Sequence, residues 1–292
     1  MNAEGTSTPV IVLRRLFALI VILGLLGGAA WAVTTLVRDS GSTTPVTTSA
    51  PPLKVLRIVF PEGFTRQEMA AQIRDVNKIA EQKRHVTPKL SPDRYLELTA
   101  SSKFPGRFAR DGQRRTLEGF LFPATYEFTK RTTTERLVRD QLDAFRENWS
   151  QVNMRYARSK NLTPWDVLII ASMIEKEVAA PEERALVSSV IYNRLKARMP
   201  LGIDATIRYG LHIPPTEPLH ESQLNDPNPY NTRLHLGLPP GPIANPGLAS
   251  LQAAANPRQT KYLYYVRKPD KLHHAFFTNK ADFDAYQAKH GY

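Results

Sequence analysis

The sequence of 292 residues predicts an α+β protein that is anchored in a membrane. Three observations predict this: an uncharged apolar run at residues 16–37, a strand–helix–helix–strand order within residues 54–128, and a nearly all-apolar helix that begins at residue 164. A chain of this length can bury a core without covalent cross-links. It contains no cysteine, which excludes disulfides, thiolate metal sites and a cysteine nucleophile.

The apolar run at residues 16–37 follows Arg14 and Arg15 directly. As a helix it would span roughly 33 Å, enough to cross a bilayer's hydrocarbon core. The positive-inside rule makes residues 1–15 a cytoplasmic tail and places the chain after Arg38 outside. The alternative is a signal peptide, because residues 30–32 have the small-x-small form of a cleavage site. The length of the run favours an uncleaved single-pass anchor in the plasma membrane.

The composition is strongly basic, with 39 Lys and Arg against 27 Asp and Glu and a net charge of +12. Such a charge favours acidic partners: nucleic acid, anionic lipid or anionic cell-wall polymers. An extracytoplasmic protein does not meet nucleic acid, so we expect no nucleic-acid partner. A general benefit to solubility would explain the same excess.

The elements after the anchor begin with residues 38–53, whose Ser, Thr and Pro content predicts a flexible linker. Alternating apolar and polar residues at 55–60 predict a strand, which the turn at residues 61–63 ends. Thr65 and Glu68 form a capping box, which predicts the start of a helix.

A second helix is expected to begin at Ser91, with Pro92 in its first turn. Residues 119–128 are strand-like again, which completes a small α+β module over residues 54–128. A second domain, residues 129–292, is expected to begin with a polar-rich helix over about 132–160.

The most informative segment is the helix that follows Thr163, which forms a capping box with Asp166. Its apolar residues extend almost all the way round, which predicts a buried helix. Helical geometry places Glu175 about 80° from the centre of the apolar stripe. Partial desolvation there favours the neutral form of a carboxylic acid, as a general acid requires.

Other interpretations of this segment stay open. Residues 175–177 are Glu-Lys-Glu, and a charged run is commonly a solvated helix end. Ser172 and Lys176 suggest a Ser–Lys hydrolase, but the spacing differs from that of penicillin-binding proteins and no SDN or KTG element follows. The histidines at 273–274 are expected on an exposed strand, and the sequence has no HExxH motif. We therefore expect no metal and no cofactor.

We expect the rest of the chain to form a scaffold around a cleft. A helix is expected from Pro181. Residues 214–246 form a long irregular stretch rich in Pro, Asn and Gly, and loops of that length are commonly functional or disordered. Its Tyr, Asn, Thr and Arg side chains suit sugars, although they are also ordinary turn residues. Residues 262–268 and 273–278 predict a hairpin, followed by a short helix to about residue 288.

Several segments together resemble the YceG-like family of membrane-anchored endolytic murein transglycosylases, in the family's order and over most of the chain from Lys54. They are residues 117–126 (LEGFLFPATY), 171–177 (ASMIEKE), 190–195 (VIYNRL), 199–206 (MPLGIDAT), 229–232 (PYNT) and 237–247 (GLPPGPIANPG). The resemblance implies a LysM-like module at 54–128 and a catalytic domain at 129–292.

The resemblance implies an enzyme that acts on peptidoglycan glycan strands, with Glu175 as its catalytic residue and peptidoglycan synthases as candidate partners. It would cleave the bond between N-acetylmuramic acid and N-acetylglucosamine and form 1,6-anhydro ends, limiting strand elongation. The alternative is a non-catalytic glycan-binding scaffold of the cell-wall synthesis machinery. The candidate substrate-binding residues are Glu118, Tyr126, Asn193, Arg194, Asp204, Thr206, Tyr230, Asn231 and Thr232.

Two positions depart from the family's pattern. Gly202 stands where the family often has Gln, so contacts of a Gln side chain do not carry over there, whereas Asp204 and Thr206 do. Arg233 stands where an aromatic residue is frequent, which leaves that subsite open.

Overall fold

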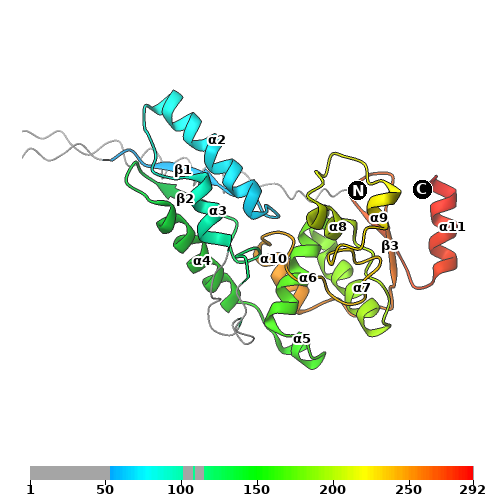
Figure 1. Cartoon of the computed structure of the whole chain (residues 1–292). Coiled ribbons are helices and arrows are strands. Elements are labelled where there is room, and N and C mark those ends of the chain that lie inside the picture. Colours follow the sequence, from blue (N-terminus) through cyan, green and yellow to red (C-terminus); the bar gives the residue numbers. More distant parts are fainter. Residues whose placement is uncertain (1–52, 101–107, 109–114, 292) are drawn as a thin grey trace, which may run out of the picture. The chain divides into compact units, whose positions relative to one another are not determined.

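The computed structural model describes residues 53–100, 108 and 115–291 (Figure 1). All of these described residues belong to one compact unit. The expected cytoplasmic tail and membrane helix, and nearly all of the linker, lie outside the described residues. Within the described ranges, no helix is both long and apolar enough to cross a membrane.

The first elements along the chain are a two-stranded antiparallel sheet and the helices beside it. β1 (Leu56–Val59) pairs with β2 (Thr125–Phe128). α2 (Arg66–Arg84) packs against β1 and against α3 (Pro92–Ala100). The capping box expected at the start of α2 is present, and α3 begins at the proline expected for it. The strand–helix–helix–strand order is therefore confirmed.

The second strand is shorter than expected. It was predicted over residues 119–128 but begins only at Thr125. The backbone N–H groups of Gly119 and Leu121 instead donate to the side-chain oxygen of Asn245, at 2.8 and 3.0 Å. Gly119 has φ of +88°, a left-handed conformation that interrupts an extended strand. A distant side chain thus replaces the strand partner here.

The long helix predicted over 132–160 is two helices, α4 (Thr134–Ser150) and α5 (Arg155–Ser159). The chain turns between them so that Val152 and Met154 enter the core, where they are 9% and 3% exposed. α4 packs against α3, so elements on both sides of the expected domain boundary share one hydrophobic core. The division at residue 128 stays a prediction.

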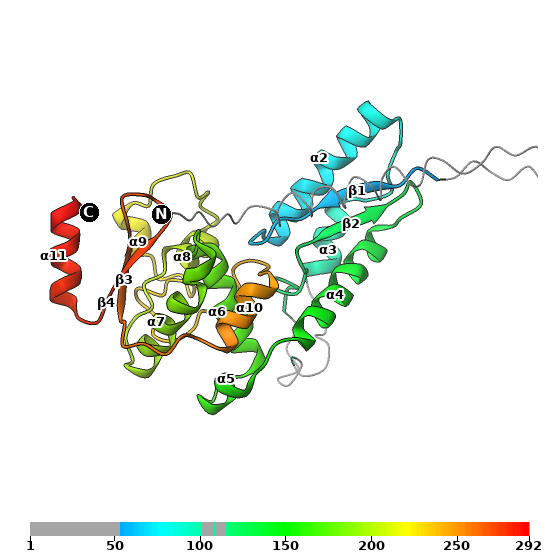
Figure 2. The same cartoon turned by 180° about the vertical axis from the view of Figure 1, so that it is seen from behind.

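The centre of the remaining part is α6 (Pro164–Glu177), with the expected capping box at its start. Residues 167–174 are all buried, as the sequence predicted. α6 packs along α10 (Leu248–Ala255), and both contact α7 (Arg184–Lys196), which follows the short 3-10 helix η2 (Pro181–Glu183) (Figure 2).

Several short helices were not expected. α8 (Asp204–Leu211) and α10 span eight residues each, about two turns, which is too short for an apolar periodicity to stand out. The stretch 214–246 is irregular as predicted, apart from α9 (Glu221–Leu224).

The chain ends in the predicted hairpin, β3 (Tyr264–Arg267) and β4 (His274–Phe277), followed by α11 (Lys280–His290). The expectation of an exposed histidine pair is wrong for His274, which is 4% exposed. Its Nδ1 lies 2.7 Å from Oε2 of Glu183, and its backbone N–H donates to the same carboxylate. This buried pair fastens β4 to the segment before α7.

Candidate active site around Glu175

Glu175 lies in the last turn of α6, and its side chain is 6% exposed. Its Oε2 accepts a hydrogen bond from the backbone N–H of Gly247 at 3.0 Å. Gly247 is the N-cap residue of α10, so the carboxylate lies at the positive end of that helix. For Glu175, the alternative of a solvated helix end is excluded.

Arg184, the first residue of α7, supplies the nearest positive charge. Its Nη2 lies 3.8 Å from Oε1 of Glu175. Its Nε donates to Oγ of Ser250 in α10 at 3.2 Å, and the side chain is only 16% exposed. The guanidinium is therefore held between α7 and α10, beside the end of α6.

A second carboxylate, Glu62, reaches the same guanidinium from the turn that follows β1. Its Oε2 lies 3.9 Å from Nη2 of Arg184, and its side chain is 48% exposed. Burial raises the pKa of Glu62, and the negative charge of Glu175 raises it further, while Arg184 acts in the opposite direction. The sequence predicted this turn only as the end of a strand.

The turn that carries Glu62 is tied to α6. Gly63 has φ of +80°, and a β-carbon there would contact Cγ of Glu175 at 3.5 Å. Nζ of Lys176 donates to the backbone oxygen of Gly63 at 3.2 Å. The neighbour of Glu175 along the helix thus holds the turn in place.

Asn245 joins this turn to the loop that leads into α10. Its backbone oxygen accepts from the N–H of Gly63, and its own N–H donates to the oxygen of Phe64, both at 2.9 Å. Its side-chain nitrogen donates to Phe64 and to Glu118. The loop carrying Gly247 and the turn carrying Glu62 are therefore fixed relative to each other.

Glu118, a candidate substrate-binding residue, lies inside this network and is 1% exposed. It accepts hydrogen bonds from the backbone N–H of Arg66, the hydroxyl of Tyr209 and the side chain of Asn245. Burial raises its pKa to about 7, against the lowering effect of these donors. Its contacts are those of a residue that holds loops together.

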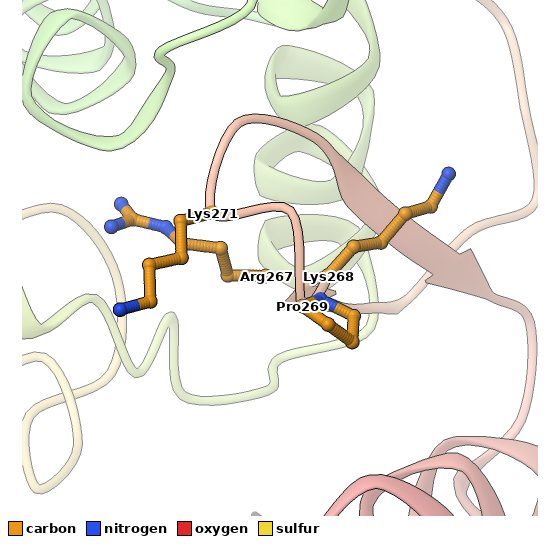
Figure 3. A pocket seen from close by; sticks show the side chains of 4 residues that line it. All are labelled: Arg267, Lys268, Pro269 and Lys271. Atoms are coloured by element: carbon orange, nitrogen blue, oxygen red, sulfur yellow. The ribbon is translucent and has the colours of Figure 1, made fainter.

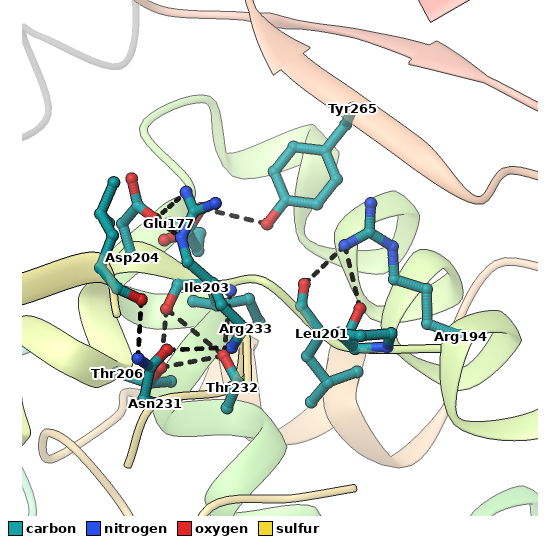
Figure 4. A network of polar contacts seen from close by, with 12 residues as sticks. Glu177, Arg194, Leu201, Ile203, Asp204, Thr206, Asn231, Thr232, Arg233 and Tyr265 are labelled. Carbon is teal, nitrogen blue, oxygen red and sulfur yellow. Dashed lines mark hydrogen bonds and ion pairs between the residues drawn. The ribbon is translucent and has the colours of Figure 1, made fainter. Parts of the chain in front are cut away.

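Four other candidates, Asp204, Thr206, Asn231 and Thr232, come together at the start of α8 (Figure 4). The hydroxyls of Thr206 and Thr232 are 3.0 Å apart, and both side chains are buried. Asn231 is buried too and donates to the backbone oxygens of residues 224 and 226. Asp204 is different, because its side chain is 48% exposed.

Asp204 forms an ion pair with Arg233, with Nη2 and Oδ1 2.5 Å apart. The arginine that departs from the family's usual aromatic residue therefore neutralises a neighbouring candidate.

The remaining candidates lie elsewhere. Asn193 donates to the backbone oxygens of residues 260 and 262, and Arg194 donates to those of residues 201 and 263, which attaches the β3 segment to α7. Tyr126 is in β2 and donates to the oxygen of Phe122. The ring of Tyr230 is half-buried and 5.1 Å from that of Tyr209.

Glu177, two residues after Glu175, faces another part of the molecule. Its Oε2 accepts from the hydroxyl of Tyr265 in β3 at 3.0 Å (Figure 4). Burial raises the pKa of both groups. The two glutamates at the end of α6 thus have separate surroundings.

The Ser–Lys interpretation has no structural support. The hydroxyl of Ser172 donates to the oxygen of Ile169 and accepts from the N–H of Ile243, inside the core. Lys176 donates to Gly63 instead. Over the described part of the chain, no three His, Asp or Glu side chains are grouped as metal ligands.

A shallow hollow lies at the tip of the β3–β4 hairpin and is lined by Arg267, Lys268, Pro269 and Lys271 (Figure 3). Its lining includes none of the residues around Glu175.

Sequence reasoning missed Glu62, Arg184, Asn245 and Gly247. Asn245 and Gly247 lie in a segment that carries the family resemblance, but no local pattern indicates what they contact. Glu62 and Arg184 stood out only as parts of a turn and a helix. Their meeting with Glu175 depends on tertiary packing.

The fold and the site define an α+β protein with a shielded glutamate at the end of a buried helix. The chain belongs to the YceG-like family, whose model matches residues 32–289.

Three comparisons with individual proteins agree with this family. An endolytic murein transglycosylase of Streptococcus pneumoniae (strain R6) is 32% identical over 246 residues, which cover 80% of this chain and 44% of the relative. One of Bacillus subtilis (strain 168) is 32% identical over 216 residues, 73% of this chain and 59% of the relative. The chain thus spans about half the length of these curated relatives.

The third is a crystal structure of a YceG-like protein from Listeria monocytogenes. It aligns with a TM-score of 0.61 and 27% sequence identity, covering 79% of this chain and 75% of the other.

Proposed function

We propose that this chain is an endolytic lytic transglycosylase that cleaves the bond between N-acetylmuramic acid and N-acetylglucosamine in peptidoglycan. Its membership of the YceG-like family supports this, as do the names of the relatives. The single observation that carries the mechanism is the carboxylate of Glu175, nearly withdrawn from solvent and fixed by Gly247 and Arg184. Such a group is suited to proton transfer in a confined site.

In this mechanism Glu175 acts twice. As an acid it donates its proton to the glycosidic oxygen, and the bond to the anomeric carbon of N-acetylmuramic acid breaks. The resulting carboxylate then takes the proton of the 6-hydroxyl, whose oxygen attacks the same carbon and closes the 1,6-anhydro ring. Because the attacking group belongs to the same sugar, its effective concentration is high and no activated water is needed. The step requires neither a metal nor a cofactor.

The test compares the two glutamates at the end of α6. Purified protein is incubated with isolated peptidoglycan, and the products are analysed by mass spectrometry for 1,6-anhydro ends. We expect Glu175→Gln to lose activity by at least about 100-fold, the usual contribution of a general acid. Glu177→Gln keeps an oxygen that can accept from Tyr265, so it should retain most of the activity. A protein that binds glycan without releasing anhydro ends would instead be a scaffold.

We further propose the membrane anchor at residues 16–37 and a LysM-like role for residues 54–128, which would align the glycan strand. The linker of residues 38–53 is short: at about 3.3–3.6 Å per residue it reaches at most about 58 Å. The site would therefore stay near the membrane, where it would cut nascent strands beside peptidoglycan synthases and limit their length.

A further inference from the structure

We propose that Glu62 is a positioning residue for the reaction. It shares Arg184 with Glu175 and thereby keeps one proton on the pair formed by these two carboxylates. This inference rests on the proposed function. It adds a second carboxylate, from a different part of the chain, to a mechanism that otherwise has one.

The geometry of Arg184 carries the proposal. Its Nη2 atom lies almost equally far from the two carboxylates, 3.8 Å from Glu175 and 3.9 Å from Glu62. One guanidinium can balance only one carboxylate charge. Two carboxylates facing one guanidinium leave one negative charge unbalanced, and the negative charge of Glu175 raises the pKa of Glu62. A retained proton is what the acid step consumes.

The other groups that face the pair come from α6 and from the N-terminus of α10. Lys176 on α6 directs its ammonium to the backbone oxygen of Gly63. The N-terminus of α10 offers the N–H of Gly247 to Glu175 and the hydroxyl of Ser250 to Arg184. The raised pKa of Glu62, which burial and Glu175 both cause, agrees with a shared proton.

Gly247 gives independent support, because the side chain of Glu62 packs directly against it. A β-carbon at this position would clash with Oε1 of Glu62. The backbone itself does not require glycine, since φ is −77° and ψ is 172°. The three atoms nearest to that β-carbon all belong to the side chain of Glu62. The end of a glutamate side chain can move aside, so Gly247→Ala offers a way to displace Glu62 without altering it.

The experiment measures kcat and KM on peptidoglycan from pH 4 to pH 9 for the full chain and four variants. Glu62→Gln and Gly247→Ala should each lower kcat at neutral pH by about tenfold, as one unit of apparent pKa would. In both variants the fall in kcat at alkaline pH should begin at a lower pH than in the wild type. KM should change less than twofold. Glu97→Gln, an exposed glutamate on α3, is the matched control and should behave as the wild type. Glu62→Asp should recover part of the lost rate.

Two results separate this inference from the proposed function. If the wild type is active and Glu175→Gln is not, but Glu62→Gln and Gly247→Ala keep the wild-type pH profile, the role of Glu62 is wrong and the function stands. If the wild type itself is inactive, the function fails. In that case, the interaction between Glu62 and Glu175 can still be measured. The free energy of unfolding is determined over a range of pH for Glu62→Gln, Glu175→Gln and the double variant. Coupling predicts pH-dependent non-additivity, and additive effects at every pH would overturn it.

Discussion

Asn245 donates from its side-chain nitrogen to Oε1 of Glu118 at 2.7 Å, across 127 residues of chain. The side-chain oxygen of the same Asn245 accepts two backbone N–H groups from the turns that follow Glu118. The Asn245–Glu118 pair therefore provides hydrogen-bond acceptors for backbone N–H groups in the loop before β2. It also fixes the loop before α10, which carries Asn245. The positions of Glu62 and Gly247 depend on it.

A prediction about pH follows for Glu118. Because its folded pKa is raised to about 7, its contribution to stability is complete below the unfolded pKa and is lost as the pH rises through 7. The neutral Glu118→Gln variant should lack this loss, which amounts to at most about 3 kcal/mol between pH 4.5 and pH 8. Urea unfolding over that range measures it. Parallel curves for variant and wild type would show that Glu118 does not titrate there.

Asn245→Ala should be strongly destabilising. It leaves the N–H groups of Gly119 and Leu121 buried without their acceptor, and each such group costs about 1–3 kcal/mol. We expect a loss of about 3–5 kcal/mol in the free energy of unfolding. Asn148→Ala is the control, because that half-buried side chain donates only to the oxygen of Ala144 and should cost about 1 kcal/mol. Similar losses for both variants would contradict the bracing role of Asn245.

Asp204→Asn separates binding from stability. The ion pair with Arg233 is exposed, so its removal should change the free energy of unfolding by less than about 1 kcal/mol. If Asp204 contacts glycan, as the family resemblance implies, KM for peptidoglycan should rise while kcat is kept. An unchanged KM would remove Asp204 from the binding site.

Thr232→Val tests a buried member of the same cluster. The substitution leaves the N–H of Ile203 without its acceptor at 3.0 Å, which should cost about 1–3 kcal/mol in the free energy of unfolding. Because Thr232 is 1% exposed, we expect this loss without a change in KM. A raised KM in a protein of wild-type stability would show instead that the hydroxyl contacts glycan.

A further prediction concerns the membrane anchor and is tested in cells. If residues 16–37 stay uncleaved, placing the chain from residue 54 behind a cleavable signal peptide should leave activity on isolated peptidoglycan unchanged. Its effect on glycan strand length in cells should weaken, because the site is no longer held near the membrane. Recovery of the natural protein as a soluble form beginning near Val33 would rule out the anchor.

Local signals in the sequence predicted much of the fold. The capping boxes at Thr65 and Thr163 act within one helical turn, so residue types at fixed spacing suffice to predict where α2 and α6 begin. The burial of α6 followed from its apolar periodicity, which also singled out Glu175.

Distant contacts could not be predicted in the same way. Residues 119–124 look like a strand, but the N–H groups of Gly119 and Leu121 donate to a side chain more than 120 residues away. Glu62 and Glu175 both lie beside Arg184, which no local pattern indicates. Several candidate binding residues, among them Glu118 and Asn193, form hydrogen bonds to backbone groups instead. Which backbone groups need such a partner depends on the tertiary structure and cannot be inferred from the sequence.

The separation of Glu62, Glu175 and Gly247 along the chain has a consequence for biogenesis. Each comes from a different stretch, and Gly247 is synthesised last of the three. A fragment of this chain that stops before Gly247 lacks the backbone N–H that fixes Glu175. Under the proposed function, such a fragment should release no 1,6-anhydro ends from peptidoglycan, so activity would arise only after the segment that carries Gly247 has folded onto the rest.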